Sequence, residues 1–104
     1  MRARRGRDRR LLLEHIKHSL DALAAGILRN MPEDERVLAG WRHVCGAQAA
    51  EHTKAISFRG GKLTVDVDDA AWLATLLQMR GQYIARLRGL TGVAVEHLDF
   101  LKQP

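Results

Sequence analysis

The sequence is poor in residues that cross-link or rigidify a chain, with one cysteine and two prolines among 104 residues. The single Cys45 has no partner for an intramolecular disulfide, which indicates a reducing compartment or no redox role. No apolar run approaches the roughly 18 residues that a membrane span requires, and the N-terminal segment lacks the apolar core of a secretory signal. We therefore expect a cytoplasmic protein without membrane contact.

The motifs that carry catalysis are also lacking. The sequence contains no H-E-x-x-H zinc motif, no phosphate-binding loop ending in Lys-Ser/Thr and no serine nucleophile elbow. Three pairs hint at metal or thiol chemistry, but each lacks further ligands or points to different sides of its helix: His15 with His18, His43 with Cys45, and Asp66 with Asp68. We predict a protein that is not an enzyme, without catalytic residues, cofactor or metal.

Positive charge, by contrast, is abundant and concentrated at one end. Residues 1–10 contain six arginines and one acid, so they carry the whole formal net charge of +5. Residues 11–104 contain eleven basic and eleven acidic side chains. Guanidinium groups match phosphate oxygens in pairs, and such segments bind phosphates without sequence preference. We predict a mobile basic arm over 1–10 that contacts nucleic acid through Arg2, Arg4, Arg5, Arg7, Arg9 and Arg10; a merely solubilising tail is the alternative.

The rest of the chain is organised around the stretch 52–77. Apolar residues alternate with polar ones on both sides of Gly60-Gly61, which predicts a β-hairpin with Ile56 and Phe58 on one face of its first strand. Asp68 and Asp69 then occupy the N-cap position of a helix over 69–88. We expect Trp72, at the start of that helix, to lie in the core.

Two helices are predicted before the hairpin and one strand after the last helix. Apolar spacing of three and four predicts a helix from Arg9 to about Arg29 and another from Pro32 to about Glu51. Trp41 of the second helix should be buried, and Gly46 within it suggests close approach of a neighbouring backbone. The final strand, 93–100, changes the phase of its apolar residues, which favours a bulge near residues 96–97.

This order predicts an α+β domain over 11–104 with the arrangement α-α-β-β-α-β. A right-handed crossover places the third strand parallel to the second in a three-stranded mixed sheet, with helices covering one face. The other face would stay partly exposed, lined by Ser57, Arg59, Lys62, Thr64 and Asp66. We add the two cations of this face, Arg59 and Lys62, to the predicted nucleic-acid-binding residues.

Four segments together resemble the DciA family, the operators of the bacterial replicative helicase. They are W-x-x-V-x-G at 41–46, His52-Thr53, the stretch from Gly61 to Trp72 that contains G-x-L-x-V and A-x-W, and the closing strand from Val95 to Phe100. The resemblance covers about residues 10–100. It implies a KH-like domain that binds single-stranded or forked DNA and assists loading of the replicative DNA helicase in DNA replication.

The resemblance does not extend to the usual nucleic-acid grip of KH domains, a G-x-x-G loop between two helices. Binding would therefore use the arm and the basic surface, which makes this chain a non-enzymatic DNA-binding adaptor. The alternative is a protein-interaction module that docks its basic arm on an acidic partner without nucleic acid. The sequence indicates no oligomeric state.

Overall fold

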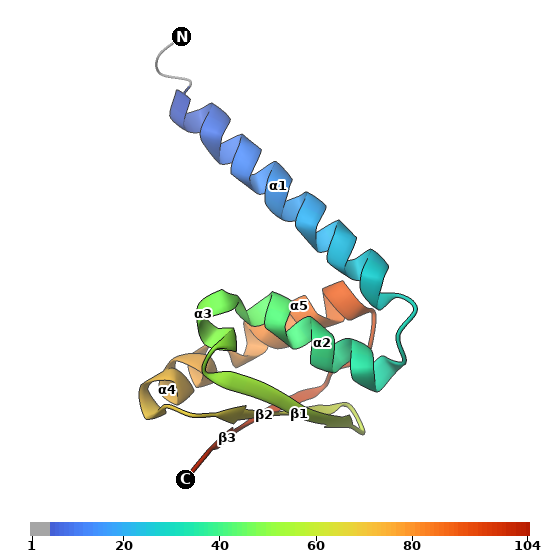
Figure 1. Cartoon of the computed structure of the whole chain (residues 1–104), viewed down its shortest axis with the longest axis vertical. Coiled ribbons are helices and arrows are strands. Elements are labelled where there is room, and N and C mark those ends of the chain that lie inside the picture. Colours follow the sequence, from blue (N-terminus) through green and yellow to red (C-terminus); the bar gives the residue numbers. More distant parts are fainter. Residues whose placement is uncertain (1–4) are drawn as a thin grey trace.

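Figure 1 shows the computed structural model of the chain, which describes residues 5–104, with side chains for residue 12 and from residue 14 onward. A three-stranded sheet is covered on one face by helices, and a long N-terminal helix projects from the helical layer. This is the predicted α+β class. The elements in chain order are α1 (Arg5–Leu28), α2 (Glu33–Cys45), α3 (Ala47–Ala50), β1 (Thr53–Arg59), β2 (Lys62–Val67), α4 (Ala70–Gln78), α5 (Arg80–Thr91) and β3 (His97–Lys102).

The sheet has the predicted mixed topology, in the order β1-β2-β3. β1 and β2 are antiparallel, and β3 runs parallel to β2, as the crossover prediction requires. The hairpin turn consists of Gly60 and Gly61 at φ values of 55° and 77°, which glycine adopts without strain. The N–H groups of Glu96 and His97 both donate to the carbonyl of Gly61, at 2.8 and 3.0 Å, and so fix the start of β3 beside the turn.

A bulge was predicted in the last strand, near residues 96–97, but the structure has it in β1. The register of β1 against β2 shifts between Ala55 and Ser57, so Ile56 lies outside the pairing and its side chain is 44% exposed. The predicted shared face for Ile56 and Phe58 is therefore wrong, because the extra residue reverses the alternation and returns Phe58 to the core side. The final strand also differs: β3 covers 97–102 rather than 93–100.

Trp41 is the centre of the core, as predicted. Its side chain is fully buried, packs edge-on against Tyr83 at 5.2 Å between ring centroids, and lies 5.8 Å from Phe100. The indole Nε1–H donates to Thr53 Oγ1 at 3.0 Å, and this hydroxyl donates to the carbonyl of Ala49 at 2.8 Å. Every polar atom of this arrangement thus has a partner, which a buried donor requires.

Two helices predicted as continuous are interrupted. Gly46 separates α2 from α3 at a φ of 88°, and Met79 separates α4 from α5. The prediction that Gly46 marks close packing is wrong, because an added Cβ there would meet nothing within 4 Å. Close packing occurs one helical turn and a half earlier, at Gly40, where an added Cβ would lie 3.0 Å from Thr91 Cγ2 of α5.

Substitution of Gly40 by valine should therefore lower the free energy of unfolding by about 1–3 kcal/mol, since two further methyl groups must fit between α2 and α5. The matched control is Gly89→Val on α5, where an added Cβ meets nothing within 4 Å. We expect urea unfolding to show a marked shift for the first variant and little change for the second. Equal effects at the two positions would contradict the close approach at Gly40.

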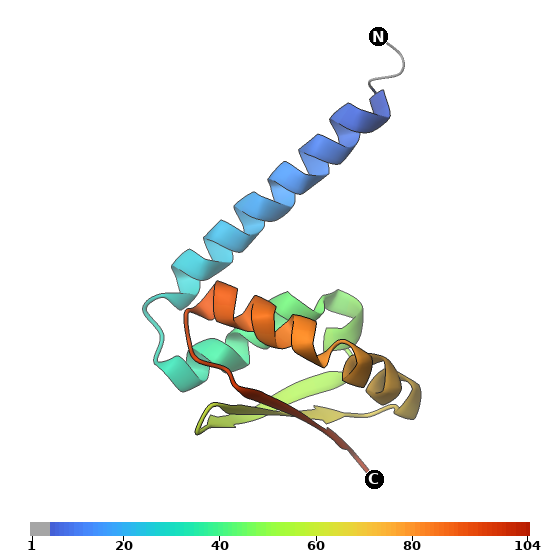
Figure 2. The same ribbon diagram turned by 180° about the vertical axis from the view of Figure 1, so that it is seen from behind.

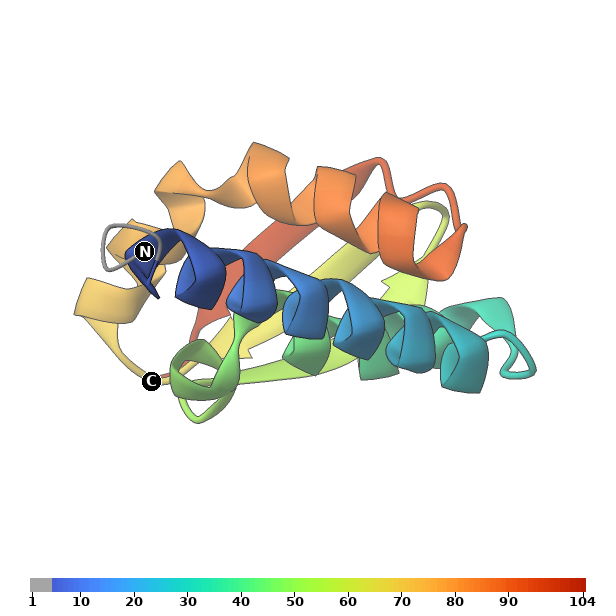
Figure 3. The same cartoon turned by 90° about the horizontal axis from the view of Figure 1, so that it is seen from above.

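α1 contacts α2 and α5 near its C-terminal end (Figure 1), and seen from above it runs over these two helices (Figure 3). Figure 2 shows α5 between this helix and the sheet. A polar contact between His43 Nε2 of α2 and Asp21 Oδ1 of α1, 2.6 Å apart, joins the two helices. The Arg36 guanidinium holds the following loop by donating to the carbonyls of Met31 at 2.9 Å and Thr91 at 3.0 Å. Among the helices of residues 5–104, none combines the length and apolar character needed to cross a bilayer.

Candidate nucleic-acid interface

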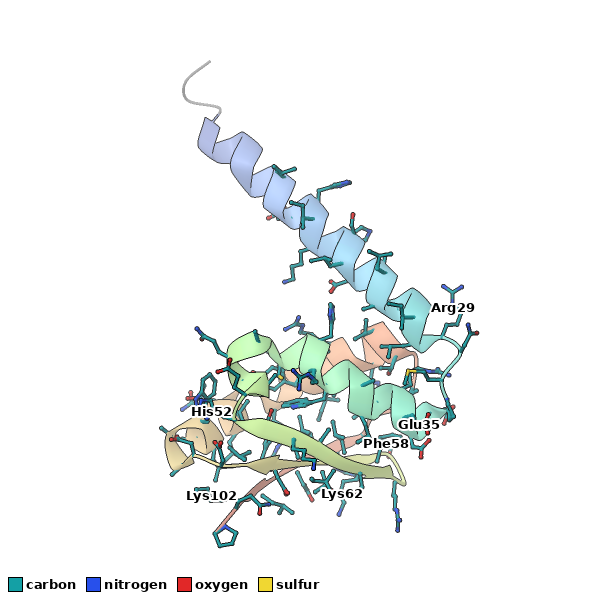
Figure 4. The ribbon with its side chains drawn as sticks, viewed as in Figure 1. Arg29, Glu35, His52, Phe58, Lys62 and Lys102 are labelled. Atoms are coloured by element: carbon teal, nitrogen blue, oxygen red, sulfur yellow. The ribbon has the colours of Figure 1, made fainter. Side chains whose placement is uncertain are left out.

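The tip of the hairpin brings together the two predicted cations of the sheet. Arg59 and Lys62 are directly paired across β1 and β2, and both side chains are exposed. Their neighbours Phe58 and Leu63 turn toward the core, which leaves the cations on the uncovered face. Figure 4 shows Lys62 on the side of the sheet opposite the helices. Like charges in direct cross-strand positions repel each other, so a bound anion would stabilise this pair.

The remainder of the uncovered face is mixed in charge rather than basic. Lys62 Nζ lies 3.6 Å from Asp99 Oδ2 of β3, and both side chains are about half exposed at 52% and 50%. An exposed pair of this kind contributes little to stability and can open to admit a phosphate. Asp66 lies further along the same face of β2. Lys54 of β1 is also exposed and is paired across the strands with Asp66, so the hairpin tip is the place on this face where the structure pairs two cations directly.

The arginines predicted for the arm are separate from the hairpin tip. Arg2 and Arg4 lie outside the described residues. α1 begins at Arg5, four residues before the predicted helix start, so Arg5, Arg7, Arg9 and Arg10 belong to its first turns. This end of α1 projects away from the sheet (Figure 1). The predicted binding residues that the structure describes thus form two groups at different ends of the molecule.

A second set of basic side chains lies on the helical layer. Arg42 of α2 and Arg86 of α5 are both exposed and both act electrostatically on the Cys45 thiol. Arg86 also lines a cavity of about 350 Å³ between α1 and the layer, together with His18, Asp21 and His43. α5 carries two further exposed arginines, Arg80 and Arg88, and the packing of α2 on α5 adds Arg42 to the same layer. This packing left no signal in the sequence.

Burial weakens the nucleophilic character of Cys45. Burial is the largest influence on the thiol and raises its pKa above the ordinary value, against the weaker opposing effects of a hydrogen bond and of Arg42. A protonated, partly buried thiol is a poor nucleophile and a poor metal ligand. Within residues 5–104, no three His, Cys, Asp or Glu side chains converge in a way that could hold a metal ion.

His52 and Trp72, from two separate segments of the family resemblance, meet at the opposite corner of the sheet. Their rings stack at 5.4 Å between centroids and 22° between planes, and His52 Nδ1 lies 3.0 Å from Asp68 Oδ1. Trp72 packs against the core but is only half-buried, so its predicted place within the core is wrong. It sits in the first turn of α4, where one side of its ring stacks on His52.

This corner is acidic, which makes it unsuitable for phosphate. Asp69 caps α4 by accepting a hydrogen bond from the Trp72 N–H at 3.0 Å, and that bond holds the pKa of the carboxyl below its usual value. Glu51, Asp66 and Asp68 line the shallow cavity beside His52. The aromatic pair therefore joins α4 to the start of β1, at the end of the hairpin away from Arg59 and Lys62.

Comparison with known proteins places this architecture in one family. The family model described as "Dna[CI] antecedent, DciA" matches residues 11–100, nearly the whole chain. A UPF0232 protein of Mycolicibacterium paratuberculosis is 34% identical over 59 residues, which cover 57% of this chain and 33% of that protein. UPF0232 proteins of Mycobacterium ulcerans and Mycobacterium marinum are 34% identical over 59 residues, 57% of this chain and 32% of each protein. The chain thus spans about a third of the length of these curated relatives.

Proposed function

The chain belongs to the DciA family, and from this premise we propose that it is a non-enzymatic DNA-binding adaptor that assists loading of the replicative DNA helicase. Its DNA partner would be single-stranded or forked, as formed during replication in the bacterial cytoplasm. The observation that carries the proposal is the separation of charge: residues 1–10 hold the entire net charge, and residues 11–104 are electrically balanced.

The geometry of α1 supports a division of tasks. A helix of 24 residues extends about 36 Å, so the arginine-rich end projects well beyond the domain. Phosphate contacts made there leave the sheet and the helical layer accessible to a protein. The Arg59–Lys62 pair at the hairpin tip supplies a second, smaller set of contacts, which would orient the domain on the strand rather than dominate its affinity.

The proposal is tested with two triple variants that lose the same charge at different places. Arg7, Arg9 and Arg10 are replaced by glutamine in one, and Arg42, Arg80 and Arg88 in the other; glutamine preserves helix propensity at these positions. Fluorescence anisotropy with a labelled oligothymidine should show a large loss of affinity for the first variant and a small one for the second. Equal losses would mean that overall charge, and not the arm, governs binding.

The second candidate is a protein-interaction module whose arm binds an acidic partner without DNA. The mixed charge of the uncovered sheet face favours it, because Asp66 and Asp99 would repel a nucleic-acid backbone. A pull-down of the replicative helicase with and without nuclease separates the two. A complex that survives nuclease and is lost with the three arm arginines supports direct protein docking; a complex that nuclease abolishes supports the DNA-binding adaptor.

A further inference from the structure

α1 exposes a continuous row of large apolar side chains, which the proposed function does not use. Leu12, Ile16, Leu20, Leu23 and Ile27 are between 45% and 73% exposed. At 100° per residue, these five positions fall within an arc of about 80° of the helix. Proteins rarely leave such an apolar row in water, and where they do it usually marks an interface. We call these five residues the α1 stripe.

The α1 stripe faces away from the protein's own domain. The side of α1 that contacts α2 and α5 consists instead of Asp21, Ala24, Ala25 and Leu28, whose positions on the helix are opposite to the stripe. No rearrangement of the side chains can bury the stripe while the His43–Asp21 pair holds the helix in place. Within residues 5–104 the stripe is therefore open to an occupant.

We propose that the occupant is a second copy of this chain, packed antiparallel along α1 about a two-fold axis beside Ser19 and Leu20. The stripe is close to symmetric about that point. Leu12 and Ile27 are fifteen residues apart, Ile16 and Leu23 are seven apart, and both pairs have the same midpoint. An antiparallel copy consequently places Leu12 against Ile27 and Ile16 against Leu23 of the other chain. Leu20 of each copy lies next to the axis, so every stripe residue gains an apolar neighbour, as an isologous interface requires.

The positive charge of residues 1–10 favours an antiparallel over a parallel arrangement of the two α1 helices. A parallel pair would bring together two segments of net charge +5, with twelve arginines at one end of the dimer. An antiparallel pair separates these segments by the length of the helix. Each would lie instead beside the C-terminal end of the other α1, which has the negative pole of the helix dipole and no basic residue in its last turn. The exposed acids Glu33, Asp34 and Glu35 begin α2 just beyond that end, and they outnumber the one exposed cation there, Arg29.

The first test measures mass by sedimentation velocity across a range of protein concentrations. Wild type should approach twice the chain mass of 11.7 kDa, whereas Leu20→Glu places two carboxylates beside the axis and should raise the dissociation constant at least about tenfold. The control is Leu77→Glu on α4, a leucine that is 42% exposed but lies outside the stripe. Circular dichroism checks that both variants keep their helices.

The second test determines the orientation by cross-linking in a Cys45→Ser background, which removes the native thiol. Leu20→Cys should form a disulfide-linked dimer on oxidation, because its Cα atoms face each other near the axis. Leu12→Cys alone should not form a disulfide-linked dimer, since the two copies of residue 12 would be about 22 Å apart along the axis of the paired helices. A mixture of Leu12→Cys and Ile27→Cys should give a heterodimer.

Three results would overturn the proposal. The first is a wild-type protein that remains monomeric at all concentrations. The second is efficient cross-linking of Leu12→Cys with itself, which indicates a parallel pair. The third is a monomer whose binding to the helicase is lost in Leu20→Glu, which assigns the stripe to that protein instead. None of these measurements involves DNA, so their outcome is independent of the proposed DNA binding.

Discussion

Replacement of Trp41 by alanine should lower the free energy of unfolding by about 3–5 kcal/mol, the usual cost of removing a large buried aromatic side chain. The indole is fully buried and packs against two further aromatic rings, those of Tyr83 and Phe100. Its loss also leaves Thr53 Oγ1 without its donor. Because a small domain has only about 5–15 kcal/mol of stability in total, we expect a substantial unfolded fraction at 37 °C in thermal unfolding.

Two comparison variants separate the contributions at this position. Trp41→Phe keeps most of the packing and removes the hydrogen bond to Thr53, which should cost about 1 kcal/mol plus a smaller packing loss. Trp72→Ala should be milder than Trp41→Ala, because Trp72 is only partly buried whereas Trp41 is fully buried. The interpretation of Trp41 as the centre of the core fails if Trp72→Ala has the larger effect.

The sequence was sufficient to predict the hairpin and the mixed sheet. Period-2 alternation around Gly60-Gly61 identifies the two strands, and the handedness of the crossover determines the direction of β3. The sequence was not sufficient to predict that Ile56 is exposed. An apolar residue that forms a bulge stands two positions from Phe58, just as a residue on the buried face would. The two internal glycines of the second helix were also indistinguishable: only packing reveals that Gly40 is needed for close approach and Gly46 for a positive φ.

The same limitation applies to α1 and to the candidate interface. Periodicity shows which side of α1 is apolar, but not whether the domain or another molecule covers it, and here the domain covers the opposite side. The sequence predicts Arg59 and Lys62 on one face of the hairpin, and the structure adds that they are directly paired across β1 and β2. The distance between that pair and the arm depends on the direction of α1, which is set by contacts such as His43 with Asp21 that the linear sequence does not show.

The salt dependence of DNA binding should be the largest effect of any change to this chain. If all six arginines of residues 1–10 contact phosphates of a single strand, the logarithm of the binding constant falls with the logarithm of salt concentration with a slope of about −4. Between 50 and 200 mM salt the affinity would then fall by about 10²- to 10³-fold. Replacement of all six by glutamine should remove nearly all of this slope, as measured by anisotropy over a salt series.

The matched control for that variant is Arg59→Gln combined with Lys62→Gln at the hairpin tip. Two contacts at most are lost there, and one of the cations is already shared with Asp99, so the slope should change by only about 1. A six-arginine variant that retains the wild-type slope would contradict the assignment of the phosphate contacts to the arm. If the hairpin variant then lost the slope instead, the uncovered end of the sheet would be the principal binding surface, and α1 would serve association between proteins alone.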